Sequence, residues 1–339
     1  MFPKINREHF LTRQFLVGLS VVILVIVVTF RYTEVGAAQV ERATLMMNWL
    51  PQGQAVPFFV GLEKGIFLKH GIALEIYRGY GSVPTITAVD TKQMTFGYGE
   101  AFATIMANTK GVNVSIVSML TDANTLSLGG LRERLKNDPR NLDGKKIGLD
   151  QGSIARLFFP VYARTKGFDP SKVEIVTMSI AVCIPAVLKG DIDGTSFFRG
   201  SNLQDFYKEA EKAKKELTFF DVGRDLGVYG IALFTSNSVI ENNPDLVRRF
   251  VAATVESMEQ TKKDPDAAAK ALLKSHPELP SETTTKSVYE MVEDMQGPFG
   301  LGWIDKEKMT RTRDIVLEAY GIKDKLPLDK IYSTKFRAK

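Results

Sequence analysis

Short apolar segments and segments with helical periodicity follow one another along residues 44–119. A strand is expected where β-branched and other apolar residues alternate with polar ones, and a helix where apolar residues recur every three or four positions. The strands are predicted at Thr44–Asn48, Ile72–Tyr77, Met94–Gly97 and Val112–Met119, and the helices at Pro57–Leu68 with an interruption near Gly65, Ser82–Val89 with Ser82 as N-cap, and Glu100–Asn108. Strands that alternate with helices predict parallel sheets covered by helices on both faces.

A polar stretch at 121–144 interrupts this alternation, and its Gly129-Gly130, Asp138-Pro139 and Asp143-Gly144 pairs are turn signals. The alternation then resumes. The strands are predicted at Lys146–Asp150, Val173–Met178, Gly194–Phe198 and Leu217–Asp221, and the helices at Ser153–Lys166 with Ser153 as N-cap, Val182–Leu188 and Asn202–Lys215. A second break at 222–230 contains three glycines, and the chain beyond it is predicted to be helical.

Two breaks around one α/β block predict an α/β fold with two lobes, the first of them discontinuous. Residues 39–122 and 230–339 would form lobe I, with the C-terminal helices packed on it, and residues 123–229 would form lobe II. Two chain crossings make a hinge, and the cleft between two parallel-sheet lobes is the expected place for a ligand.

The N-terminal segment has the order of a secretory signal. Basic residues Lys4, Arg7 and Arg13 precede an apolar run at 15–30, and the small residues 36–38 follow. The apolar run is shorter than the roughly 20 residues that span a bilayer. We therefore expect residues 1–38 to be a cleaved signal peptide and the protein to be periplasmic, with an uncleaved membrane anchor as the alternative.

Charge and cysteine content narrow the classes of function. The 339-residue chain has a net charge of +5, but its 44 basic and 39 acidic residues are interspersed, which argues against a nucleic-acid partner. Its single cysteine, Cys183, cannot form an internal disulfide or a cysteine-based zinc site. Neither His70 nor His276 has a metal-ligand partner at helical spacing. We expect no cofactor, no metal and no catalytic residues.

Several motifs together resemble a known family. They are Met47-Asn48-Trp49-Leu50-Pro51, Glu63–Phe67, Gly79-Tyr80-Gly81-Ser82, Phe96–Ala101, Leu142–Gly148, Gly152-Ser153, Leu188–Asp193 and Asn243–Val247. In order and spacing the chain resembles the substrate-binding proteins of ABC importers that are grouped with thiamine-pyrimidine-precursor, nitrate, sulfonate and taurine binders. The resemblance implies a monomeric type II periplasmic-binding-protein fold that binds a small molecule and delivers it to an ABC permease in the inner membrane.

Candidate ligand-binding residues in lobe I lie where predicted strands end, because strand ends in α/β sheets face the ligand crevice. Trp49 offers a ring for stacking on a flat ligand, or is a core residue. Gly81 and Ser82 form a turn into a helix whose free N–H groups can hold polar atoms, or simply cap it. Tyr98 and Glu100 offer hydrogen bonds, with Glu100 as an ordinary helix-start acid in the alternative. Gln52 completes the lobe I set.

Lobe II supplies the opposite wall in this prediction. Gly152 and Ser153 form a second glycine-containing turn into a helix. Arg156 in the first turn of that helix is suited to pair with a carboxylate, phosphate or sulfonate, although surface solvation explains it equally well. Phe198 and Arg199 end a strand and are predicted to face the ligand, with a plain core role open for the phenylalanine.

The predicted ligand is a small, flat, polar solute, with a pyrimidine-type thiamine precursor first and a nitrate- or sulfonate-like anion second. Two other functions remain open: an enzyme of pyrimidine synthesis on the same fold, and a membrane-anchored sensor. The resemblance implies that such synthases need a cysteine-rich metal segment, which one cysteine does not supply.

We expect export to remove the N-terminal segment near Ala38, so that the mature protein begins at Gln39. N-terminal sequencing or the intact mass of the exported protein measures this directly. A product that still begins near Met1 and fractionates with membranes would show that the apolar run is an anchor.

Overall fold

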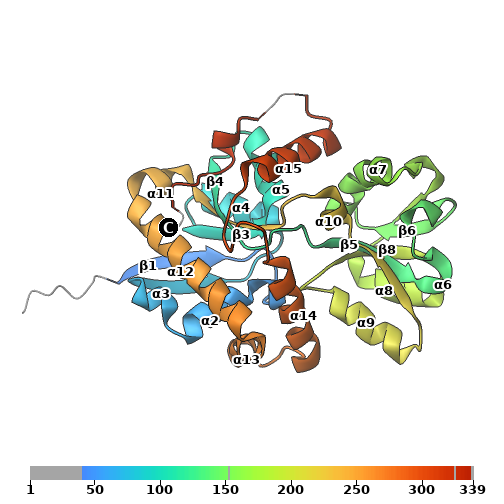
Figure 1. Cartoon of the computed structure of the whole chain (residues 1–339), viewed down its shortest axis with the longest axis horizontal. Helices are drawn as coiled ribbons and strands as arrows, with labels where there is room; N and C mark the ends of the chain where they lie inside the picture. Colours follow the sequence, from blue (N-terminus) through green and yellow to red (C-terminus); the bar gives the residue numbers. More distant parts are fainter. Residues whose placement is uncertain (1–39, 152, 324–325, 337–339) are drawn as a thin grey trace, which may run out of the picture. The chain divides into compact units, whose positions relative to one another are not determined.

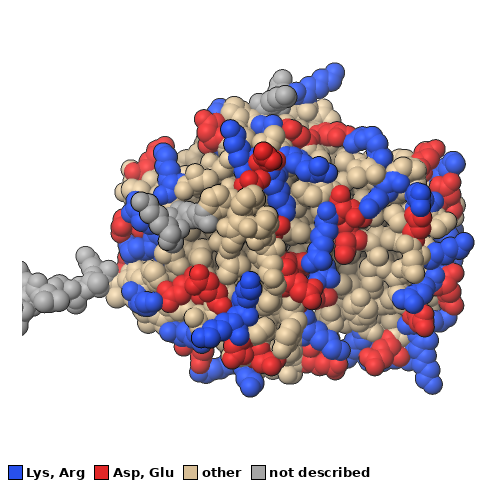
Figure 2. Space-filling view, viewed as in Figure 1, with Lys and Arg blue, Asp and Glu red and all other residues tan. Residues whose placement is uncertain are grey.

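The computed structural model describes residues 40–151, 153–323 and 326–336, and from Glu41 onward the chain forms one compact unit (Figure 1). The predicted signal peptide lies outside the described residues. Within the described part of the chain, no helix has the length and apolar character needed to cross a membrane. Acidic and basic side chains are intermingled over the visible face (Figure 2), as the sequence indicated.

The first sheet has five strands in the order β2-β1-β3-β10-β4. The strands are β1 (Glu41–Met46), β2 (Ile72–Tyr77), β3 (Phe96–Glu100), β4 (Val114–Met119) and β10 (Ile231–Ser236). β1 runs parallel to β2 and β3, whereas β10 lies antiparallel between β3 and β4.

The second sheet has the same number of strands, in the order β7-β6-β8-β5-β9. Its strands are β5 (Leu126–Leu131), β6 (Lys146–Leu149), β7 (Glu174–Thr177), β8 (Gly194–Phe198) and β9 (Leu217–Phe220). β6 is parallel to β7 and β8, and β5 is antiparallel to β8 and β9. The chain passes between the sheets twice, before β5 and before β10, so the two-lobed α/β fold is confirmed. The predicted lobe boundaries remain a prediction.

Parallel sheets were expected, and both sheets are mixed: β1 pairs in parallel with β2 and β3, and β6 with β7 and β8, whereas β5 and β10 run antiparallel to their neighbours. β5 lies inside the stretch interpreted as a polar break. Its glycines are required by packing rather than by a turn: a Cβ on Gly129 would lie 2.3 Å from the Phe219 ring, and one on Gly130 would lie 2.1 Å from the carbonyl oxygen of Asp193. Glycine inside a strand marks such a close approach.

The predicted helices are present, with ends shifted by a few residues, and short helices also form inside the two predicted breaks. From residue 56 to residue 212 the helices are α2 (Val56–Glu63), α3 (Ile66–Lys69), α4 (Ser82–Asp90), α5 (Ala101–Thr109), α6 (Arg132–Leu135), α7 (Ile154–Lys166), α8 (Ile180–Lys189) and α9 (Leu203–Lys212). They are followed by α10 (Val222–Leu226), α11 (Asn237–Asn242), α12 (Pro244–Lys263), α13 (Pro265–Ser275), α14 (Ser281–Asp294) and α15 (Lys306–Ala319). Single 3₁₀ turns occur at Gly53–Ala55 (η1), Pro139–Leu142, Pro170–Lys172 and Leu328–Lys330.

The helix N-termini show which capping predictions hold. Ser153 caps α7, since its Oγ accepts a hydrogen bond from the backbone N–H of Arg156 at 3.3 Å. Ser82 does not cap α4. Gly81 holds the N-cap position, and the Ser82 hydroxyl instead accepts from the backbone N–H of Glu100 at 3.2 Å. The Ser82 side chain therefore ties α4 to the end of β3.

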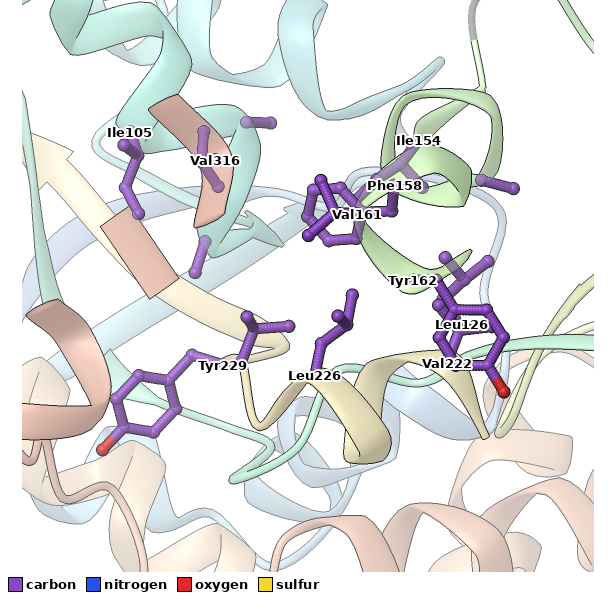
Figure 3. Packing of buried hydrophobic residues seen from close by; sticks show 14 of the residues in the cluster. Ile105, Leu126, Ile154, Phe158, Val161, Tyr162, Val222, Leu226, Tyr229 and Val316 are labelled. Carbon is purple, nitrogen blue, oxygen red and sulfur yellow. The ribbon is translucent and has the colours of Figure 1, made fainter. Parts of the chain in front are cut away.

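Apolar packing joins the helices to both sheets. On the first sheet, the ring of Phe250 from α12 stacks on Phe96 of β3 with centroids 3.8 Å apart. A second buried cluster, shown in Figure 3, extends from Ile105 of α5 and Val316 of α15 to Phe158 of α7, and includes Leu226 of α10. Because this cluster contains residues packed on either sheet, part of the junction between the lobes is apolar.

Replacing Phe250 with alanine should destabilise the fold by about 3–5 kcal/mol, because the ring is fully buried and its loss leaves a cavity against Phe96 and Phe67. Urea unfolding followed by circular dichroism measures the loss. The matched control is Leu68→Ala on α3, whose side chain is 59% exposed and should change stability by no more than about 0.5 kcal/mol. Equal effects of the two substitutions would contradict this assignment of the core.

Candidate functional site

The loop after β1 and the turn after β2 are held together at the carboxyl edge of the first sheet. The backbone N–H of Gly81 donates to the carbonyl oxygen of Asn48 at 2.6 Å, and that of Gly79 donates to Trp49 at 3.1 Å. A Cβ on Gly79 would lie 1.8 Å from the carbonyl oxygen of Met47, so only glycine allows this approach. The sequence motifs around Trp49 and Gly81 thus form one unit.

Glu100 joins this unit from the end of β3. Its backbone N–H donates to Ser82 Oγ, and its Oε2 accepts from Asn124 Nδ2 at 2.9 Å. Asn124 lies just before β5, on a segment that passes between the sheets. The carboxyl group of Glu100 is therefore placed where the first sheet ends and the chain leaves for the second.

Burial determines the charge of this carboxyl group. Glu100 is 6% exposed, and desolvation raises its pKa to about 8, with the hydrogen bond from Asn124 opposing part of the rise. At neutral pH the group is thus mainly protonated, so it can both donate and accept hydrogen bonds. Glu100 holds the N-cap position of α5, but its side chain forms no capping hydrogen bond and is buried, unlike an exposed acid stabilised by the macrodipole.

Asn124 is a site residue that the sequence did not single out. It is 2% exposed, and its Oδ1 accepts from the backbone N–H of Leu126 at 3.0 Å. The only signal was an asparagine inside the predicted break at 121–144, which usually means a turn. Its pairing with Glu100 spans 24 residues and depends on the path of the chain between the sheets.

Tyr98 lies two residues before Glu100 on β3 and is fully buried. Its ring meets Phe58 of α2 edge-on, with centroids 5.6 Å apart. Its hydroxyl has no hydrogen-bond partner among the described residues, and burial raises its pKa well above 10. Residues two apart on a strand share a face, so Tyr98 places an unpaired hydroxyl on the same face of the sheet as the Glu100 carboxyl.

Trp49 and Gln52 lie in the loop between β1 and η1. Trp49 is 46% exposed, so its ring is open to solvent and the interpretation as a core residue is wrong. Gln52 is half-buried, and its Oε1 accepts from Ser201 Oγ at 2.5 Å. Ser201 follows β8 of the second sheet. The hydrogen bond therefore links the loop after β1 of the first sheet to the loop after β8 of the second.

The predicted residues of the second sheet lie near the carboxyl ends of β6 and β7. Ser153 caps α7, as described above, and Arg156 on its first turn donates from Nη1 to Thr177 Oγ1 at 2.8 Å. Thr177 is the last residue of β7. The guanidinium group is thus held at this edge rather than extended into solvent. Gly152 lies outside the described residues.

Phe198 and Arg199 follow each other at the end of β8. Phe198 is half-buried and its backbone N–H donates to Asn202 Oδ1 at 2.9 Å. The guanidinium group of Arg199 pairs with Glu293 at 2.5 Å and Asp294 at 3.3 Å, both on α14. Arg199 is therefore occupied by protein carboxylates in this structure.

The site residues fall into three groups. Trp49, Gly81, Ser82, Tyr98 and Glu100 belong to the first sheet's edge, where Asn124 joins them. Gln52 and Arg199 belong to a polar junction around α14, and Ser153 and Arg156 belong to the edge of the second sheet. Among the described residues, no three His, Cys, Asp or Glu side chains are arranged to hold a metal ion.

Two α/β lobes with polar groups at the carboxyl edges of their sheets define the chain as having the periplasmic-binding-protein fold. The chain belongs to the NMT1/THI5-like family, whose model matches residues 52–268. The resemblance noted in the sequence is thereby confirmed.

The known proteins that are similar to this chain carry names that refer to different small molecules. The riboflavin-binding protein RibY of Chloroflexus aurantiacus is 22% identical over 305 residues, which cover 87% of this chain and 86% of RibY. A 4-amino-5-hydroxymethyl-2-methylpyrimidine phosphate synthase of Legionella pneumophila is 25% identical over 245 residues, 70% of this chain and 75% of the synthase. The crystal structure of the periplasmic aliphatic sulphonate binding protein SsuA from Escherichia coli matches with a TM-score of 0.70 at 14% identity, covering 88% of this chain and 94% of SsuA, which shows the shared fold.

The pKa of Glu100 predicts how stability changes with pH. Between its ordinary pKa of 4.5 and the raised value of about 8, the folded protein keeps a proton that the unfolded chain releases, so the free energy of unfolding falls as pH rises through this window. Glu100→Gln removes this dependence and should be more stable than the wild type near pH 8, by on the order of 3 kcal/mol.

Urea unfolding of both proteins at a series of pH values between about 5 and 8 measures the difference. The matched control is Glu241→Gln on α11, which replaces an exposed carboxylate and should leave the pH profile unchanged. A Glu100→Gln profile parallel to that of the wild type would mean that Glu100 is ionised in the folded protein.

Proposed function

We propose that this chain is the solute-binding component of an ABC importer, exported across the cytoplasmic membrane, and that it performs no chemistry. The observation that carries this proposal is the buried Glu100 carboxyl, held by Asn124 at the point where the chain passes from the first sheet to the second. A protonatable group at this point can contact a solute enclosed between the lobes. The family match and the binding proteins among the relatives support the same function.

The cysteine chemistry also favours binding over catalysis. Cys183 on α8 is fully buried, its Sγ donates to the carbonyl oxygen of Ser179 at 3.3 Å, and burial raises the pKa of the thiol. A buried thiol of raised pKa is a poor nucleophile and a poor metal ligand. The second candidate function is pyrimidine synthesis, since the Legionella relative carries the name of a synthase.

The preferred solute is a flat heteroaromatic molecule such as an aminopyrimidine. An amino group beside a ring nitrogen presents a donor and an acceptor, which match the acceptor and donor of a protonated carboxyl group such as Glu100. The exposed ring of Trp49 offers a stacking surface in the same unit. RibY is named for riboflavin, another flat heteroaromatic compound.

An anionic solute is the alternative within the same function. Sulfonates or nitrate would favour the guanidinium group of Arg156 and would be repelled by Glu100 whenever it ionises. An aminopyrimidine thus depends on Glu100 and an anion on Arg156, so substitutions at these two residues distinguish the two kinds of solute.

A thermal-shift screen of aminopyrimidines, riboflavin, sulfonates and nitrate first identifies a solute, and calorimetry on variants then tests the site. For an aminopyrimidine, Glu100→Leu should weaken binding by about 1–3 kcal/mol, because it removes both the donor and the acceptor, whereas the amide of Glu100→Gln keeps one of each and should cost less. Arg156→Ala should then have little effect. For an anion, Arg156→Ala should cost the most, and Glu100→Gln should be neutral or favourable.

The matched control is Arg248→Ala on α12, which removes an exposed guanidinium group paired with Asp245 and should leave the affinity unchanged in both cases. A solute whose affinity responds to neither Glu100→Leu nor Arg156→Ala would show that the pocket lies elsewhere. Conversion of the solute during the measurement, detected by mass spectrometry, would favour the synthase alternative.

A further inference from the structure

The last two turns of α14 carry three carboxylates. Their partners lie on the segments that follow β8 and β9 of the second sheet. Glu290, Glu293 and Asp294 are spaced three and four positions apart, so they share one face of the helix. All three form hydrogen bonds or ion pairs with residues between 199 and 224. α14 lies below the chain crossings in Figure 1, beside α9.

Asp294 has the largest number of partners. Its side chain is 1% exposed and accepts from Arg224 Nη2 at 2.5 Å and from Arg199 Nε at 3.3 Å. Its carbonyl oxygen accepts from the backbone N–H of Asp122 at 2.8 Å. Asp122 and Arg224 lie on the two segments that connect the sheets, and Arg199 follows β8. A buried carboxylate needs such partners, since an unpaired one is costly.

Glu290 forms a second set of contacts one turn earlier. Its Oε2 accepts from the backbone N–H of Gly200 and its Oε1 from Gln204 Nε2, both at 2.7 Å. Gly200 and Gln204 lie between β8 and the first turn of α9. α9 is packed on the second sheet, because Phe206 stacks on Phe197 of β8 with centroids 4.5 Å apart.

The 3₁₀ turn η1 reinforces the same junction from the first sheet's side. Gln54 Nε2 donates to the carbonyl oxygen of Arg199 at 2.6 Å and to Thr125 Oγ1 at 3.1 Å. η1 is fixed to α14, since a Cβ on Gly53 would lie 2.5 Å from the backbone carbon of Ser287. Helix and turn therefore hold the residues after β8 as one unit.

Polar contacts of this kind differ in one respect from the apolar cluster in Figure 3. When an apolar contact separates, its surfaces are exposed to water at a cost proportional to their area. Hydrogen-bonding groups regain partners in water, so each bond contributes only a small net free energy. The polar junction can therefore separate at a smaller cost than the apolar one, and the number of its bonds sets that cost.

We propose that Asp294 and Glu290 are positioning residues. They fix the distance between the two halves of the ligand site, one at the edge of the first sheet and one at the edge of the second. This rests on the proposed function in so far as the solute is bound between the lobes. In this role the two carboxylates hold Arg199 and Gly200, at the end of β8, against η1 and α14. Weakening them shifts the molecule toward arrangements with the lobes parted.

The test measures the distance between two spin labels in the protein without any solute, so its result does not depend on the identity of the ligand. Cys183 is replaced by alanine, and cysteines for labelling are introduced at Glu211 on α9 and Glu259 on α12, both exposed. α9 is packed on the second sheet through Phe206 and α12 on the first through Phe250. Pulsed electron spin resonance then gives the distance distribution between the lobes.

We expect Asp294→Asn and Glu290→Gln to raise the ratio of parted to joined molecules about tenfold each, which corresponds to about 1.4 kcal/mol. Arg224→Gln should shift the distribution in the same direction by less, because Arg199 still pairs with Asp294. The matched control on the same helix is Glu282→Gln, whose exposed carboxylate pairs only within α14, with Lys286, in the described contacts. It should leave the distribution unchanged.

A purely structural role is distinguished by the same measurement. If the variants melt at lower temperature but keep the distance distribution of the parent, the positioning role is wrong. Should Asp294→Asn fail to fold, Glu290→Gln and Arg224→Gln decide: a shift in both supports the proposal, and a shift in neither overturns it. Failure to find a solute would count against the proposed function and leave this result standing.

Discussion

The buried carboxylate of Asp294, between the guanidinium groups of Arg199 and Arg224, connects the parts of the molecule that carry the candidate site. Its side chain meets the end of β8 and one crossing segment, while its carbonyl oxygen meets Asp122 on the other. Burying a charge costs several kcal/mol unless good partners surround it, so this group constrains all three segments at once. The relative placement of the two sheet edges follows from that constraint.

A second buried carboxyl group, Glu100, differs from Asp294 in its partners. Asp294 is held by two cations, whereas Glu100 has the amide of Asn124 as its side-chain partner among the described contacts. Desolvation raises the pKa of both acids, but the guanidinium groups of Arg199 and Arg224 oppose the rise at Asp294, whereas at Glu100 the neutral amide of Asn124 opposes it and the pKa reaches about 8. The partners of a buried acid, rather than its residue type, thus distinguish the ion-paired Asp294 from the amide-paired Glu100.

The relatives fit this division of roles. The fold is shared by proteins named for riboflavin, for a pyrimidine phosphate and for aliphatic sulphonates, so the architecture alone does not select the solute. In the function proposed above, selection comes from side chains at the sheet edges, such as Glu100 and Arg156. The parts that differ in chemistry lie on loops and strand ends, while the sheets and the α14 junction supply their placement.

The sequence by itself determined the order of most helices and strands, because hydrophobic periodicity and capping residues are local signals. It also indicated the motifs around Trp49, Gly81 and Glu100. Only the tertiary structure decided that β5 and β10 run antiparallel inside their sheets, that Asn124 pairs with Glu100, and that Arg199 is bound by α14. These features depend on contacts between residues far apart in the chain, where glycines fit tight packing and polar groups find partners that no local pattern encodes.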